Sequence, residues 1–173
     1  STVTNGQVTG TTTIADGAVV VNGTADGTAE LAGTTTLTGG TLTVTDGDVA
    51  GLVNQGTTGG ATEITVTAGN VASLTNTTGE ALLNGGTVAG VTTVADGTVT
   101  NAGATLTGAA STSGTGIFTQ SAGAANGGIA NNGGTVNLNG GTAASFTGNS
   151  STTFMTGRSI TGLSTINAGT FNY

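Results

Sequence analysis

The chain has 173 residues and a formal net charge of −7, with 35% hydrophobic and only 5% charged residues. It has no Cys, His, Pro or Trp, and its one basic residue is Arg158, so most nucleophilic and Schiff-base mechanisms lack their base or nucleophile, and we expect no enzyme. An acidic chain without a basic cluster does not suit nucleic acid, no run is long enough to insert in a membrane, and the strand-forming composition argues against disorder.

A short unit recurs along the chain: apolar, any, turn residue, Gly, any, apolar. The clear copies are Ile14–Val19, Val44–Val49 and Val94–Val99, each with Asp-Gly at its centre. Looser copies are Leu37–Leu42, Val66–Val71, Leu83–Val88, Leu138–Ala143 and Ile166–Phe171. Asp and Gly both tolerate turn conformations, so the turn brings the two apolar side chains back to one interior. The unit therefore predicts a corner between two strands.

Between the corners, apolar residues alternate with Thr. Leu42 and Val44 share one side of an extended segment, and Thr43 takes the other. No stretch shows apolar residues at helical spacing. We therefore expect an all-β protein with essentially no helix.

The corners fit an antiparallel meander of Asp-Gly hairpins or a parallel β-solenoid (β-helix). Residues Val8–Gly23 align with Val88–Gly103 at an offset of 80, which suits four coils of about 20 residues. The small apolar residues suit a narrow interior, and Asn residues beside the corners could stack as amide ladders. Those Asn residues are Asn5, Asn22, Asn54, Asn84, Asn101, Asn139 and Asn167. We predict a single elongated β-solenoid domain over residues 1–173 with roughly eight coils.

The stretch from Ala109 to Gly134 is low in strand formers and rich in Ala, Gly, Ser and Asn. This composition predicts a loop-bearing or irregular segment.

The two parts of the chain differ in charge. All eight acidic residues lie in residues 1–96, whereas residues 97–173 have none and carry every aromatic residue. In a solenoid, position along the sequence maps onto position along the rod. Phe171, Tyr173 and Arg158 are therefore candidate interface residues for head-to-tail contact with another copy. The alternative is that the aromatic side chains plug the last coil.

Asp46 and Asp48 are the candidate metal ligands, because Ca²⁺ prefers carboxylate and carbonyl oxygens. They match neither an EF-hand loop nor the nonapeptide of calcium-binding β-rolls. The alternative is that they are solvated turn residues and that no cofactor is bound. The same pair keeps a carbohydrate-cleaving site formally open, although the acidic part has no aromatic platform.

The segments Gly40–Val49, Asn84–Val88 and Gly133–Leu138 resemble the repeats of bacterial surface β-helices. The nearest families are self-associating autotransporter passenger domains and haemagglutinin-type adhesins. The resemblance implies a non-enzymatic extracellular or cell-surface rod that attaches to its own copies or to surface glycans. The chain lacks the membrane barrel of those families, so it also fits a fragment, a fibre subunit, or a phage or particle spike.

An ice-binding protein is the alternative of a different class, because Thr-x-Thr pairs on a flat face can order water. The available pairs are Thr34/Thr36/Thr38, Thr41/Thr43/Thr45, Thr65/Thr67, Thr98/Thr100 and Thr105/Thr107. Their irregular separations argue against alignment from coil to coil.

Overall fold

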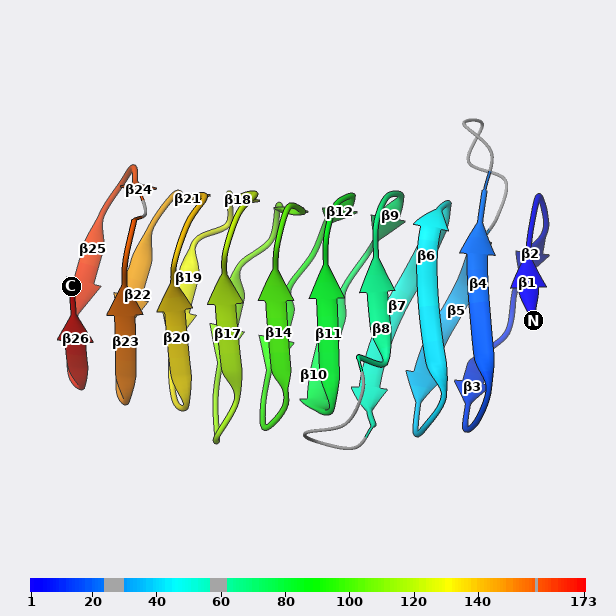
Figure 1. Ribbon diagram of the computed structural model, residues 1–173, viewed down its shortest axis with the longest axis horizontal. Helices are drawn as coiled ribbons and strands as arrows, with labels where there is room; N and C mark the ends of the chain where they lie inside the picture. The colour runs from blue at the N-terminus through cyan, green and yellow to red at the C-terminus, as the bar shows by residue number, and fades with distance from the viewer. Residues whose placement is uncertain (24–29, 57–61, 158) are drawn as a thin grey trace.

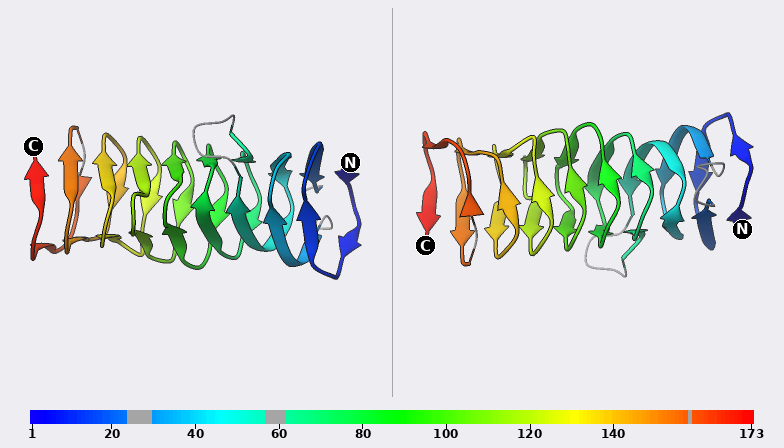
Figure 2. Two further views of the ribbon diagram at one scale, coloured as in Figure 1. Left: turned by 90° about the horizontal axis from the view of Figure 1, so that it is seen from below. Right: turned by 90° about the horizontal axis from the view of Figure 1, so that it is seen from above.

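The computed structural model is a parallel β-solenoid of about nine turns (Figure 1). It describes residues 1–23, 30–56, 62–157 and 159–173, and no helix occurs among them. The predicted solenoid is thus confirmed, with about nine turns against the roughly eight expected, and the antiparallel meander is wrong. The two ends of the chain lie at opposite ends of the rod, and the turns follow one another between them (Figure 2).

Each turn contributes strands to three faces. Face 1 is a ten-stranded parallel sheet. Its strands are β1 (Thr2–Val3), β4 (Ala18–Asn22), β6 (Thr41–Asp46), β8 (Ile64–Val66), β11 (Glu80–Leu83), β14 (Thr98–Asn101), β17 (Ile117–Gln120), β20 (Thr135–Leu138), β23 (Thr152–Met155) and β26 (Thr170–Asn172).

Face 2 and face 3 belong to one hydrogen-bonded sheet, because β5 (Glu30–Leu37) and β7 (Asp48–Gln55) run through both. The other strands of face 2 are β2 (Gln7–Val8), β9 (Asn70–Val71), β12 (Thr87–Val88), β15 (Thr105–Leu106), β18 (Ala124–Ala125), β21 (Thr142–Ala143) and β24 (Ser159–Ile160). The other strands of face 3 are β3 (Thr12–Ile14), β10 (Leu74–Thr78), β13 (Thr92–Val94), β16 (Ala110–Thr112), β19 (Ile129–Asn131), β22 (Phe146–Gly148) and β25 (Ser164–Ile166).

The strand register explains the internal repeat. On face 2, Val8 pairs with Leu31, Leu31 with Val49, Val49 with Val71, and Val71 with Val88. Val8 and Val88 are therefore separated by four turns, as the offset of 80 residues predicts.

The Asp-Gly units do form corners, but not all at the same place. Asp46-Gly47 connects β6 on face 1 to β7 on face 2, whereas Asp96-Gly97 connects β13 on face 3 to β14 on face 1. Gly47 has φ 98°, a conformation that L side chains rarely adopt. At Gly97 space is the constraint, because a Cβ would lie 2.4 Å from the carbonyl oxygen of Gly79 in the turn below.

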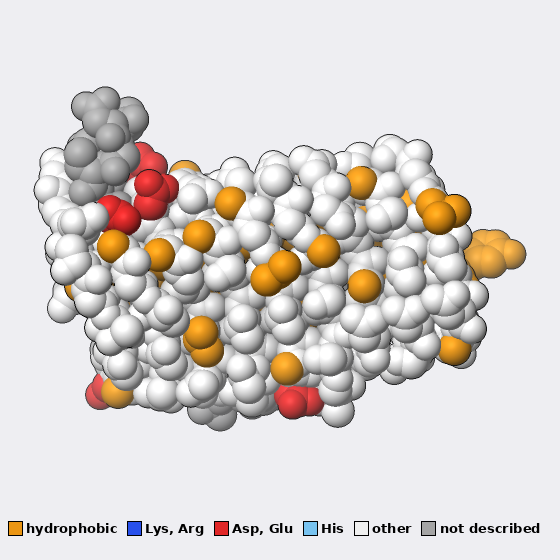
Figure 3. Space-filling view, turned by 180° about the vertical axis from the view of Figure 1, so that it is seen from behind, with side chains coloured by type: hydrophobic (Ala, Val, Ile, Leu, Met, Phe, Trp, Pro, Cys, Tyr) orange, Lys and Arg blue, Asp and Glu red, His pale blue; other side chains and the backbone are white. Residues whose placement is uncertain are grey.

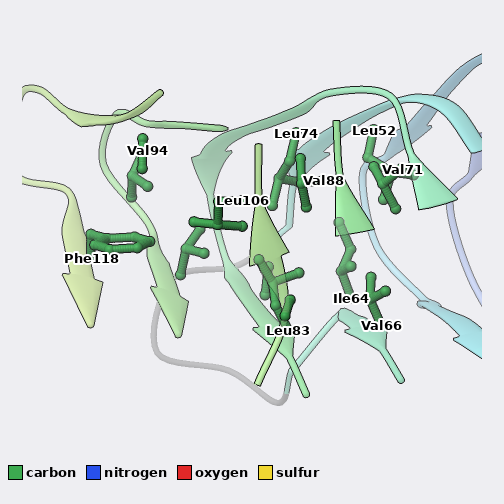
Figure 4. Packing of buried hydrophobic residues seen from close by; sticks show 14 of the residues in the cluster. Leu52, Ile64, Val66, Val71, Leu74, Leu83, Val88, Val94, Leu106 and Phe118 are labelled. Carbon is green, nitrogen blue, oxygen red and sulfur yellow. The ribbon is translucent and has the colours of Figure 1, made fainter. Parts of the chain in front are cut away.

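The interior is a continuous column of Val, Leu and Ile side chains from successive turns (Figure 4). The apolar residues that flank two of the Asp-Gly corners enter it fully: Val44, Val49, Val94 and Val99 are at most 1% exposed. At the third, Ile14 is buried and Val19 is partly buried against the column. Phe118 is also buried, between Val99 and Val136 of the neighbouring strands. Small branched side chains fill a narrow interior, and few large ones are needed.

The stretch from Ala109 to Gly134 is regular, so the prediction of an irregular segment is wrong. Strands β16 to β19 lie within it and pair in register with the turns on both sides. The physical reason is that Ala and Asn can take inward positions in a narrow coil: Ala125 and Asn131 are both fully buried. Strand propensity is overridden there by pairing with neighbours that are already in place.

Candidate functional site

The described residues form no pocket, so the candidate sites are surfaces: the three faces and the two ends. No helix in the described part is long and apolar enough to cross a membrane.

The C-terminal end exposes the inner side of the last turn. Ile166 is 47% exposed, although the residues of the same inward row in earlier turns are mostly buried. Phe171 packs on the core and lies 5.6 Å from the ring of Phe146, centroid to centroid. Tyr173 is fully exposed, with its ring 6.5 Å from that of Phe171. Of the three candidate interface residues, Phe171 helps to close the last turn and Tyr173 remains available for contact. The third, Arg158, lies outside the described residues.

The N-terminal end presents the matching rows. Ile160 belongs to the inward row of face 2 that begins at Val8, and Ile166 belongs to the inward row of face 3 that begins at Ile14. Val8 is 38% exposed at the opposite end of the rod from Ile160. Strands β1, β2 and β3 have an open edge at one end, as β26, β24 and β25 have at the other. Open edges of this kind are templates for pairing with another chain.

Asp46 and Asp48 lie on either side of the corner at Gly47. The Asp46 carboxylate accepts a hydrogen bond from the Gly47 backbone N–H at 2.8 Å, which is the role of a turn residue. Asp48 points outward on face 2 and pairs in the sheet with Glu30. Among the described residues, no three acidic side chains gather as a set that could hold a metal ion. Calcium binding at Asp46 and Asp48 remains a prediction that titration with Ca²⁺ can test.

Asp96 is held differently, at the corner between face 3 and face 1. Its Oδ1 accepts hydrogen bonds from the backbone N–H of Thr115 at 2.9 Å and from the Thr115 hydroxyl at 3.0 Å, across one turn of the solenoid. Both hydrogen bonds, the backbone one more than the hydroxyl one, lower the pKa of the Asp96 carboxyl below its ordinary value. This acid fastens one turn to the next.

Thr pairs with irregular separations are brought into register on face 1. Thr43 pairs with Thr65, and Thr100 pairs with Thr119. The outward rows also contain other residues: Glu80 and Leu82 in β11, Ile117 in β17 and Phe154 in β23. Thr36 lies on face 3 and Thr105 on face 2, so the pairs are divided among the three faces. Turns of different length still align on face 1. Irregular spacing along the sequence is therefore no argument by itself against a Thr array on this face.

Sequence reasoning predicted amide ladders beside the corners but missed most of the residues that form polar ladders between successive turns. Inside the coil, the Asn101 amide donates to the Gln120 side-chain oxygen at 3.2 Å, and the Thr112 hydroxyl donates to the Asn131 side-chain oxygen at 3.0 Å. On the outside, the amide of Asn149 donates to Asn132 and that of Asn167 to Asn149, both at 2.7 Å. The expected amide ladders thus exist with two of the Asn residues named for them, Asn101 and Asn167. The signal that could have found the others is their separation by one turn.

Comparison with models of protein families, with curated proteins and with solved structures gave no match.

Proposed function

We propose that this chain is a non-enzymatic structural and adhesive rod of the extracellular space or cell surface, which joins copies of itself head to tail. The observation that carries the proposal is the match between its two ends. Each end presents three open strand edges, and the inward row of face 2 is apolar from Val8, exposed at one end, to Ile160 at the other. The inward row of face 3 ends at the exposed Ile166, although it includes Asn and Thr residues inside the rod and Ile14 at its start is buried. Stacking one copy on the next continues all three faces without a change of register.

The row positions define the contact. Val8 of one copy takes the next position after Ile160 of another, and Ile14 takes the next position after Ile166. Full burial of a Val or Ile side chain contributes about 1.5–3 kcal/mol, so partial burial of these rows contributes a few kcal/mol in total. The C-terminal part is free of acidic residues, so the contact does not bring two acidic ends together. Surface glycans are the second class of partner for such a rod.

A head-to-tail contact can be tested with two variants, each of which is blocked at a different end. Val8→Asp places a charge on the N-terminal end, and Ile166→Asp places one on the C-terminal end. In sedimentation velocity, the unmodified chain is expected to grow in size with concentration, whereas each variant alone reaches a small limiting size and does not grow further. An equimolar mixture is expected to form species larger than either variant alone, because each variant retains the end that the other lacks. The control is Thr100→Asp on face 1, which is expected to assemble like the unmodified chain.

Two results would contradict the proposal. One is a monomeric unmodified chain at all concentrations, with and without Ca²⁺. The other is a mixture of the two blocked variants that forms no species larger than either variant alone, since a head-to-tail contact requires only one intact end from each copy.

The second candidate function is ice binding, and the observation that favours it is the alignment of Thr on face 1. Thr43 and Thr65 are paired neighbours in the outward row, and after Leu82 the row continues with Thr100 and Thr119. Thermal hysteresis of the purified chain tests this candidate, and its absence removes ice binding.

A further inference from the structure

Face 3 carries an unbroken outward row across nine strands. The members of the middle row pair one to one along the whole rod. They are Thr13, Thr36, Val53, Thr75, Thr93, Ser111, Ala130, Thr147 and Thr165. We call this row and the outward residues on its two sides the neutral face. Thr93, in the fifth of the nine strands, is its centre.

No acidic or basic residue stands in the outward positions of the neutral face in the described strands. The described acids lie elsewhere: Glu30 and Asp48 on face 2, Glu80 on face 1, Asp16, Asp46 and Asp96 at corners, and Glu63 buried just before β8. Figure 3 shows this side of the rod, with red carboxylates at the rim and none across the middle. In a chain of net charge −7, this is the surface on which two copies can meet without bringing carboxylates together.

The side chains of the middle row of the neutral face are short, whereas the outward residues beside it include the exposed Leu163 and Gln55. The middle row has Thr, Ser, Ala and Val only, and Gly51 and Gly128 lie beside it. Short and β-branched side chains lose little rotamer freedom when a partner covers them. A flat array of this kind packs against another flat sheet with interdigitating small side chains, as two stacked sheets do at a separation of about 10 Å.

We propose that the neutral face is a lateral interface, on which a second copy of this chain packs face to face with its rod axis reversed. Such a two-fold contact is self-complementary and places Thr93 of one copy opposite Thr93 of the other. The size of the neutral face suits a contact with a second copy of the chain. Nine strands at about 4.8 Å and five residues at about 3.3 Å give about 43 Å by 17 Å, or roughly 700 Å² per copy. Stable interfaces bury about 800 Å² per partner, so the pair is expected at the weaker end of specific contacts.

The lateral contact is independent of the head-to-tail contact, and a Val8→Asp background separates the two. In that background, we expect sedimentation equilibrium to show a reversible dimer. Thr93→Glu and Thr93→Lys should each weaken the dimer at least tenfold, because two like charges then face each other at the centre of the contact. An equimolar mixture of the Glu and Lys variants should recover pairing, because the facing charges are then opposite.

The matched control is Thr100→Glu, since Thr100 occupies a middle-row position on face 1 and is half-buried like Thr93. It adds the same charge and should leave the dimer unchanged. Circular dichroism checks that every variant keeps its strands. A second readout uses the absence of native Cys: spin labels on Thr93→Cys should lie close together in the dimer, whereas labels on Thr100→Cys should not.

Three outcomes would overturn the proposal. The first is a Val8→Asp chain that stays monomeric at all concentrations. The second is a dimer that Thr100→Glu weakens as much as Thr93→Glu does. The third is a monomeric chain whose thermal hysteresis is lost in Thr93→Glu, which would assign the neutral face to ice and not to a second copy.

Discussion

Replacing Asn131 by Ala tests the claim that polar ladders inside the coil hold successive turns together. Asn131 is fully buried and bonds to groups in two neighbouring turns. Its side-chain oxygen accepts from the Thr112 hydroxyl at 3.0 Å and from the Gly133 backbone N–H at 3.3 Å. Its amide nitrogen donates to the Thr152 carbonyl at 2.9 Å and to the Thr153 hydroxyl at 3.0 Å.

The expected cost follows from the groups left without partners. A buried donor or acceptor that loses its partner costs about 1–3 kcal/mol, and Asn131→Ala affects several of them together. Some of these groups can reorient, so the sum is smaller than the separate costs, and we expect a loss of about 3–5 kcal/mol in the free energy of unfolding. Urea unfolding followed by circular dichroism measures this loss.

The matched control is Asn137→Ala in β20. Asn137 points outward and donates one hydrogen bond to Thr119 at 3.3 Å, so its removal should cost at most about 1 kcal/mol. If the two Ala variants unfold at the same urea concentration, the internal ladder contributes no more than a surface bond, and the reasoning fails.

Three further predictions concern the core, one corner and one exposed acid. Phe118→Ala should cost about 3–5 kcal/mol, because Phe118 is 1% exposed and its loss leaves a cavity between two turns; urea unfolding measures this. Gly47→Ala should cost about 1–2 kcal/mol in the same assay, since φ 98° is unfavourable for any residue with a Cβ. For Asp96, the lowered pKa means that the ionised carboxyl stabilises the folded state above the pKa of the unfolded chain. This stabilisation is lost as the pH falls through the pKa of the folded state, so the unmodified chain should lose more stability on acidification than Asp96→Asn.

Each of these predictions has an opposite outcome that would count against it. A Phe118→Ala chain as stable as the unmodified chain would mean that the interior is not packed at that turn. A neutral Gly47→Ala would mean that the corner does not require a left-handed residue. Equal acid sensitivity of the unmodified chain and Asp96→Asn would mean that Thr115 does not bind the carboxylate.

Much of the fold can be predicted from the sequence because its corners and strands are local features. The unit from Val94 to Val99 shows by itself that both apolar ends face inward, and the offset of 80 residues implies an integral number of turns. Which faces a corner connects is not visible locally: Asp46-Gly47 and Asp96-Gly97 have the same sequence, but they occupy different corners. That difference depends on how each turn stacks on the one before it.

The surfaces are harder to predict than the corners because they are assembled from residues about one turn apart. Turn length varies, with 22 residues from Thr43 to Thr65 and 18 from Leu82 to Thr100, so no fixed period reveals the rows. Because of the same variation, the neutral face could not be predicted from the sequence. The charge asymmetry along the chain can be predicted, because it depends only on the order of the residues.

The central claim is that this chain is a self-associating rod, and imaging it tests that claim most directly. Negative-stain micrographs of the purified, unmodified chain at increasing concentration should show filaments or paired rods, and these should be lost in Ile166→Asp combined with Thr93→Glu. A field of single short rods at every concentration, with and without Ca²⁺, would contradict the claim.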